Sequence, residues 1–138
     1  MRMKVAAVAV AVTVAAYLAW LGWDQQRNPD GTGPYEAWQV AGLALTLAVV
    51  AAACSWRSAD VAQAMVVAVM MAAALTVPWS IDAATDKTPD ANLWPVGAIF
   101  LYGGTASGLI VVSLVTRAVW QWTHRHWTPP PPGPLTGH

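Results

Sequence analysis

Four long apolar segments, bounded by turn-forming residues, constrain this chain more than any other feature of its sequence. They contain 19, 18, 17 and 25 residues and cover residues 5–23, 37–54, 61–77 and 96–120. A helix that crosses a bilayer needs roughly 17–25 predominantly apolar residues. Arg117 is the only Asp, Glu, Lys or Arg in the four segments. The sequence therefore predicts an all-α, polytopic membrane protein with four transmembrane helices in an antiparallel bundle.

Composition and the carboxyl-terminal segment set the domain organisation. Charged residues make up 10% of the 138 residues, against about 25% in soluble domains. One transmembrane domain over residues 1–127 is expected. The segment "TPPPPGPLTGH", residues 128–138, holds four consecutive prolines, which favour polyproline II over a packed element. We expect a disordered cytoplasmic tail there, with a spacer or a docking segment as alternatives.

The first apolar segment has a second interpretation. The chain begins "MRMK", and "VAA" at residues 14–16 offers small residues of the kind that precede signal-peptide cleavage. The apolar run nevertheless continues to Trp23, beyond the usual length of a signal core. We expect a retained first span; cleavage would leave three spans.

Charges at the ends of the spans predict the orientation. Five Lys and Arg residues fall on one side of the predicted membrane and two on the other, while six of the seven acidic residues follow the opposite distribution. The two sides thus carry formal charges of +4 and −4. Short basic segments stay in the cytoplasm. We expect a multi-pass plasma-membrane protein with both termini cytoplasmic and with residues 24–36 and 78–95 outside.

The tryptophans fit the same arrangement. Trp prefers the headgroup level, where its ring is half wet and its N–H finds a partner. Eight tryptophans near the ends of the predicted spans are expected to be interface anchors: Trp20, Trp23, Trp38, Trp56, Trp79, Trp94, Trp120 and Trp122.

The first predicted outer loop supplies a resemblance. Asn28-Pro29-Asp30-Gly31 is a turn sequence, which favours a structural loop over a binding loop. The flanking stretches "WDQQ", residues 23–26, and "GPYEAWQV", residues 33–40, resemble small four-span integral membrane proteins of actinobacteria without assigned function. The likeness is best over the first two spans. It implies the four-span fold and supplies no catalytic or binding residues.

The sequence contains few residues that could form a catalytic, redox or metal site. Cys54 is the only cysteine, so no C-x-x-C redox motif exists, and the predicted spans hold no carboxylate, His or Lys for proton coupling. The histidines His124, His126 and His138 lack neighbouring ligands, and "WQWTHRHW" better suits an anionic lipid surface than a metal. We expect no enzymatic activity, cofactor, metal site or nucleic-acid partner.

Small residues in the spans predict helix packing. Gly104 and Gly108 lie four residues apart on one face of the fourth span, where they could pack within the bundle or join two copies. Alanines recur at the same spacing in the other spans: Ala7, Ala11, Ala15 and Ala19, then Ala44, Ala48 and Ala52, then Ala64, Ala68 and Ala72. Between the second and third spans, Ser58 is the expected N-cap and Asp60 belongs to the first turn.

The predicted spans are rich in small residues that pack helices together and poor in catalytic or ion-binding residues, and this favours one class of function. We expect a non-enzymatic accessory or assembly subunit that lies in the lipid bilayer and acts through partner membrane proteins. The alternative is a small oligomeric transporter or channel subunit, for which Thr105, Ser107 and Ser113 supply only a thin polar stripe.

Overall fold

The computed structural model describes residues 2–23, 35–58, 60–85 and 93–125. These residues form four helices: α1 (Arg2–Trp20), α2 (Ala37–Arg57), α3 (Val61–Thr85) and α4 (Trp94–Arg125). Each helix is long and apolar enough to cross a bilayer. The predicted all-α bundle of four candidate membrane spans is therefore confirmed, and the chain is an integral membrane protein.

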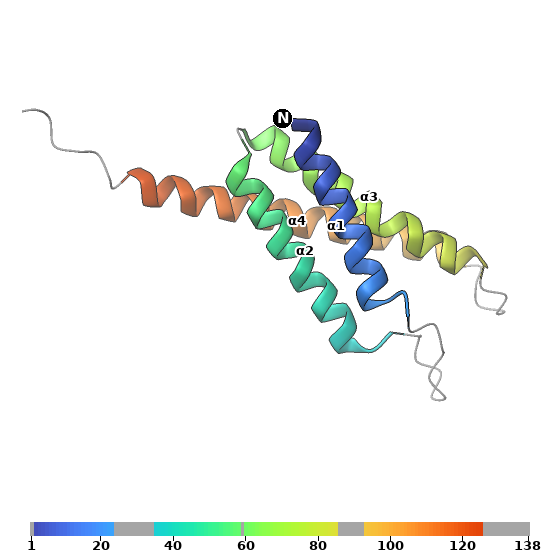
Figure 1. The fold of residues 1–138 in the computed structure, drawn as a ribbon. Helices are drawn as coiled ribbons and strands as arrows, with labels where there is room; N and C mark the ends of the chain where they lie inside the picture. The colour runs from blue at the N-terminus through green and yellow to red at the C-terminus, as the bar shows by residue number, and fades with distance from the viewer. Residues whose placement is uncertain (1, 24–34, 59, 86–92, 126–138) are drawn as a thin grey trace, which may run out of the picture.

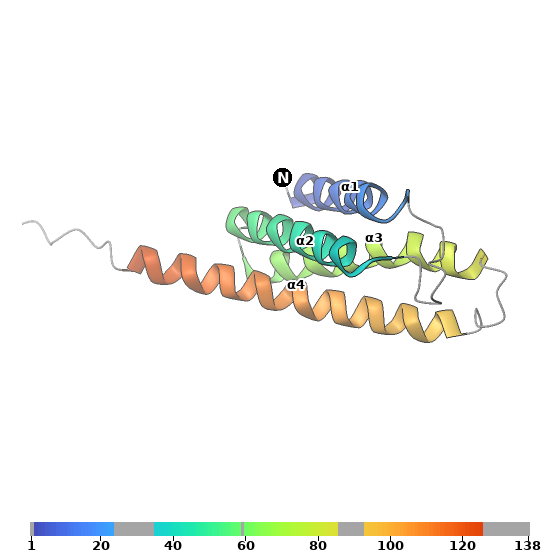
Figure 2. The same cartoon turned by 90° about the horizontal axis from the view of Figure 1, so that it is seen from below.

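The helices pair as two antiparallel hairpins that cross obliquely, α1–α2 over α3–α4 (Figure 1). The most extensive contact joins α3 to α4, and α1–α3 and α2–α4 contacts hold the hairpins together. Figure 2 shows α1 farthest from α4, with α2 and α3 between them. The start of α1, the α2–α3 connection and the end of α4 lie at one end of the bundle, here called the termini end; the opposite end is the loop end.

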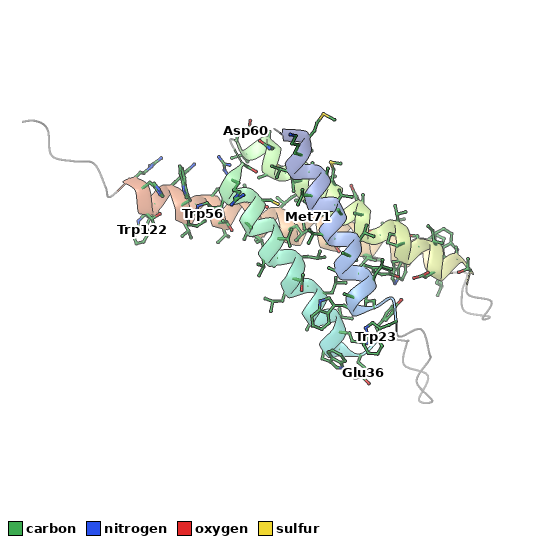
Figure 3. The ribbon with its side chains drawn as sticks, in the orientation of Figure 1. Trp23, Glu36, Trp56, Asp60, Met71 and Trp122 are labelled. Carbon is green, nitrogen blue, oxygen red and sulfur yellow. The ribbon has the colours of Figure 1, made fainter. Side chains whose placement is uncertain are left out.

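The core gathers around α3. Met71 and Ala72 have no exposed surface, and Met71 lies near the middle of the bundle (Figure 3). The predicted alanine row of α3 is buried as a whole, at Ala64, Ala68 and Ala72. Small side chains on this central helix let its neighbours approach closely. The alanine row of α1 is instead exposed, at Ala7, Ala11, Ala15 and Ala19.

Helix α3 continues past the predicted end of its span at residue 77. It runs through Pro78 to Thr85, and α4 begins at Trp94, so the expectation of a loop over residues 78–95 is wrong for residues 78–85 and 94–95. The outer location of these residues stays a prediction. Proline removes one helical hydrogen bond, which membrane helices tolerate when neighbouring helices support the backbone. Trp79 supplies such support, because its ring lies against Gly97 of α4.

Helix α4 also exceeds its predicted span. Its 32 residues correspond to roughly 48 Å, longer than a hydrocarbon core of roughly 30 Å. Residues 121–125 are exposed and extend the helix beyond the bundle at the termini end (Figure 1).

Capping side chains fix where two helices begin. At the start of α2, Gln39 Oε1 accepts the backbone N–H of Glu36 at 2.7 Å. At the start of α3, Asp60 Oδ1 accepts the N–H of Gln63 at 2.7 Å. Asp60 is therefore the N-cap of α3, and the prediction that Ser58 has this role is wrong. The Ser58 hydroxyl instead donates to the Cys54 carbonyl, at 2.7 Å in the last turn of α2.

Some predictions lie outside the described residues. They concern the turn sequence of the first loop, residues 126 and 127, and the tail over residues 128–138.

Candidate functional site

An apolar groove lies between α2 and α4 and has a volume of about 440 Å³. Its floor comes from α1 and α3, since Tyr17, Leu75 and Trp79 line it together with α2 and α4 residues. No Asp, Glu, Lys, Arg or His is among the described residues that line it. The two hairpins cross obliquely at this groove (Figure 1), and residues of all four helices line it.

Both walls of this groove contain small residues among larger ones such as Leu43, Leu47, Leu101 and Leu109. Gly104 and Gly108 lie on the α4 wall, and Ala44 and Ala48 lie on the α2 wall. A Cβ atom added at Gly104 or Gly108 would meet no described atom within 4 Å. The close helix approach predicted for these glycines therefore has no counterpart inside the single chain. A contact between them and another molecule stays a prediction.

Two other glycines make the close contacts. A Cβ at Gly42 of α2 would lie 2.6 Å from the Trp20 ring of α1, and one at Gly97 of α4 would lie 2.9 Å from the Trp79 ring. Sequence analysis missed both glycines. The available signal was the level of these residues along the membrane normal. Each pair joins a Trp near the end of one helix to a Gly near the start of the next, so both residues lie at the loop end.

Trp20 is held over α2 by several contacts. Its indole Nε1 donates to Thr46 Oγ1 at 3.2 Å. Its ring meets Trp38 edge-on, with centroids 6.0 Å apart. Thr46 in turn donates to the Gly42 carbonyl at 2.8 Å. Trp20 is thus a packing residue between α1 and α2, in addition to the anchor that the sequence predicts.

A polar contact lies next to the groove. Tyr17 is 2% exposed, lines the groove and donates its phenolic O–H to the Asp82 carboxylate of α3. Tyr35 lines the groove on the same side. Because α3 continues to Thr85, the third candidate span contains Asp82. The predicted span, residues 61–77, holds no carboxylate, and Asp82 lies on the part of α3 that continues beyond it.

The remaining predicted anchors lie towards the two ends of the bundle. Trp23 at the loop end and Trp56 and Trp122 at the termini end are all exposed (Figure 3). Trp38 is exposed beside Glu36, to which its indole N–H donates. Trp94 begins α4 at the loop end. These positions suit headgroup contact, and anchoring itself stays a prediction.

The described part of the segment "WQWTHRHW", residues 120–125, lies exposed on the last turns of α4. The Trp120 and His124 rings stack with centroids 4.3 Å apart on the exposed part of α4. Arg117 turns towards α2 and donates from Nη1 to the Ser58 carbonyl at 3.1 Å. Arg117 therefore belongs to the bundle and not to the exposed end of α4.

No three His, Cys, Asp or Glu side chains converge on a metal-sized site within the described part of the chain. Comparisons with protein-family models, curated proteins and solved structures give no match. The resemblance to actinobacterial four-span proteins therefore stays a prediction.

Proposed function

We propose that this integral membrane protein is a non-enzymatic accessory or assembly subunit, and that a transmembrane helix of a partner protein docks in the groove between α2 and α4. The observation behind the proposal is the unfilled space at Gly104 and Gly108 in a groove of about 440 Å³. Helices in membranes associate by close packing of small residues, and both walls supply these.

The residues that line the groove indicate which kind of partner helix would fit it. No charged side chain of the described residues lines the groove, so an apolar helix face fits it. The wall positions at Gly104 and Gly108 leave open space, so the partner has to supply Leu-, Ile- or Phe-sized side chains there. Thr105 on the α4 wall offers a hydroxyl to that helix.

A partner protein suits the groove better than a second copy. In a symmetric dimer through this face, both copies would offer the same glycine-lined hollow, and neither would fill the other. Bulky exposed residues of this chain, such as Phe100 and Val115, lie on α4 without lining the groove. Their insertion would be a head-to-tail contact, which does not close in two copies.

The proposed orientation follows the charges. Among the described side chains, Lys4, Arg57, Arg117 and Arg125 lie at the termini end with one acid, Asp60, whereas Glu36 and Asp82 lie towards the loop end. This distribution supports cytoplasmic termini in the plasma membrane.

The alternative function, a small oligomeric transporter or channel subunit, has less support. Several hydroxyls in the helices donate to carbonyls one turn back in their own helix: Thr13 to Ala9, Thr46 to Gly42, Thr76 to Ala72 and Thr116 to Val112. Such hydroxyls are already used by the backbone of their own helix. Of the predicted polar stripe, Thr105 lines the groove, Ser107 is exposed and Ser113 is buried, so the three do not line one surface.

Site-specific photo-crosslinking in native membranes tests the docking proposal. A benzophenone amino acid at Val40, a half-exposed groove residue, should give an adduct whose crosslinked peptide is a transmembrane segment of another protein. The same probe at Val66 of α3, which is similarly exposed and does not line the groove, should not. Gly108→Leu should fill the groove and remove the Val40 adduct.

Each other result contradicts the partner proposal. An adduct of twice the chain's mass would identify a second copy and favour the oligomeric alternative. An adduct with lipid alone would show a lipid-filled groove. An adduct that survives Gly108→Leu would place the contact elsewhere on the surface.

A further inference from the structure

A second, smaller pocket lies at the termini end, between the last turn of α2 and α4, and polar side chains line part of it. It is lined by Ser55, Trp56, Ser58, Arg117 and Trp120 and has a volume of about 70 Å³. A water molecule needs roughly 10–15 Å³ in the same measure. The pocket therefore has room for a group of a few heavy atoms, which is the size of a phosphate group.

Two buried polar atoms at this pocket have no hydrogen-bond partner among the described residues: Ser55 Oγ and Arg117 Nε. Ser55 is only 2% exposed. Buried polar atoms in folded proteins normally have a hydrogen-bond partner. An atom without one among the described residues therefore indicates a partner from outside them, such as a bound group. Other hydroxyls in these helices, such as that of Ser58, donate to a carbonyl one turn back, but the Ser55 hydroxyl does not.

The charge of Arg117 favours an anion. No described Asp or Glu forms an ion pair with its guanidinium, whose one described bond goes from Nη1 to the Ser58 carbonyl at 3.1 Å. That bond offsets the partial negative charge at the end of α2. The remaining N–H groups of an arginine form a planar fork that matches phosphate oxygens.

We infer that Arg117 and Ser55 form a binding site for a phosphate group, with an anionic phospholipid of the surrounding leaflet as its source. Trp56 and Trp120 flank the pocket, and their rings suit the headgroup level where a lipid phosphate lies. Basic pockets between transmembrane helices bind anionic headgroups by this chemistry. The site is separate from the apolar groove, so it does not depend on the proposed docking of a partner helix.

Lipid titration of the purified full-length chain in a non-ionic detergent tests this inference, with native mass spectrometry as the readout. Phosphatidylglycerol should bind about tenfold more tightly than phosphatidylcholine with the same acyl chains, because choline covers the phosphate with a positive charge. Arg117→Gln and Ser55→Ala should reduce this preference, the first to near equality and the second by several-fold. Arg57→Gln removes an exposed arginine at the same end and is the matched control, with less than a twofold change expected.

Two further arms make the result decisive. Glycerol 3-phosphate and inorganic phosphate distinguish the sources: displacement of lipid by either means that a free phosphate suffices, and no displacement means that the lipid is required. If Arg117→Gln fails to fold, Ser55→Ala and Arg117→Lys, which keeps the charge without the fork, decide the question. The inference is overturned if these variants keep the full preference, or if Arg57→Gln lowers it as much as they do.

Discussion

Tyr17 of α1 donates its phenolic O–H to the carboxylate of Asp82 of α3, across 65 positions of sequence. This contact ties the first hairpin to the second beside the groove. It exists only because α3 continues past Pro78, which carries Asp82 into the bundle.

Loss of the Tyr17 hydroxyl should weaken the contact between the two hairpins. We expect Tyr17→Phe to lower the free energy of unfolding in detergent by about 1–2 kcal/mol, since a hydrogen bond to a carboxylate is lost from a partly buried site. Tyr102→Phe, at an exposed tyrosine of α4, is the matched control and should have little effect. A double-mutant cycle with Asp82→Asn should give a coupling of about 0.5–2 kcal/mol. Coupling near zero would mean that the contact contributes nothing to stability.

The glycines should differ sharply when a single methyl group is added. Gly42→Ala should destabilise the protein by about 1–3 kcal/mol, because the new Cβ would meet a Trp20 ring already held by Thr46 and Trp38. Gly104→Ala should be neutral or stabilising by up to about 1 kcal/mol, because its Cβ meets open space and alanine favours a helix. Thermal unfolding followed by circular dichroism measures both. Equal destabilisation by the two substitutions would contradict the close contact at Gly42 and the open space at Gly104.

The N-cap of α3 can be assigned by a similar pair of variants. Asp60→Ala should lower stability by about 0.5–2 kcal/mol, because the Gln63 N–H loses its acceptor. Ser58→Ala should cost less, because its hydroxyl donates only to a carbonyl in the last turn of α2. The reverse order of effects in chemical denaturation would restore Ser58 as the capping residue.

The orientation can be read with reporter fusions. Fusions after residues 30 and 88 should report the outside, and fusions after residue 57 and at the carboxyl terminus should report the cytoplasm, because basic segments are retained there. Alkaline phosphatase and a fluorescent protein give complementary signals in the two compartments. A cytoplasmic signal from either loop fusion would contradict the proposed orientation.

The sequence by itself determined how many helices this chain forms and that they belong in a membrane. Both properties depend on the length and apolar character of short, continuous segments, which are local quantities. The starts of α2 and α3 at residues 37 and 61 were likewise readable, because the polar residues that precede them are local signals. The opposite charges of the two sides follow from sequence in the same way.

Tertiary structure alone decided which face of each helix meets its neighbours. The helices are apolar on nearly every side, so the pattern of the sequence gives little information about which way each helix is rotated. The crossing of the two hairpins chose Gly42 and Gly97 as contact points and left Gly104 and Gly108 facing a groove. It also brought Ser55 and Arg117 together from distant positions. The rotation of each helix is fixed by its packing against residues that are far away in the sequence. The hydrophobic pattern of one segment carries no information about those contacts.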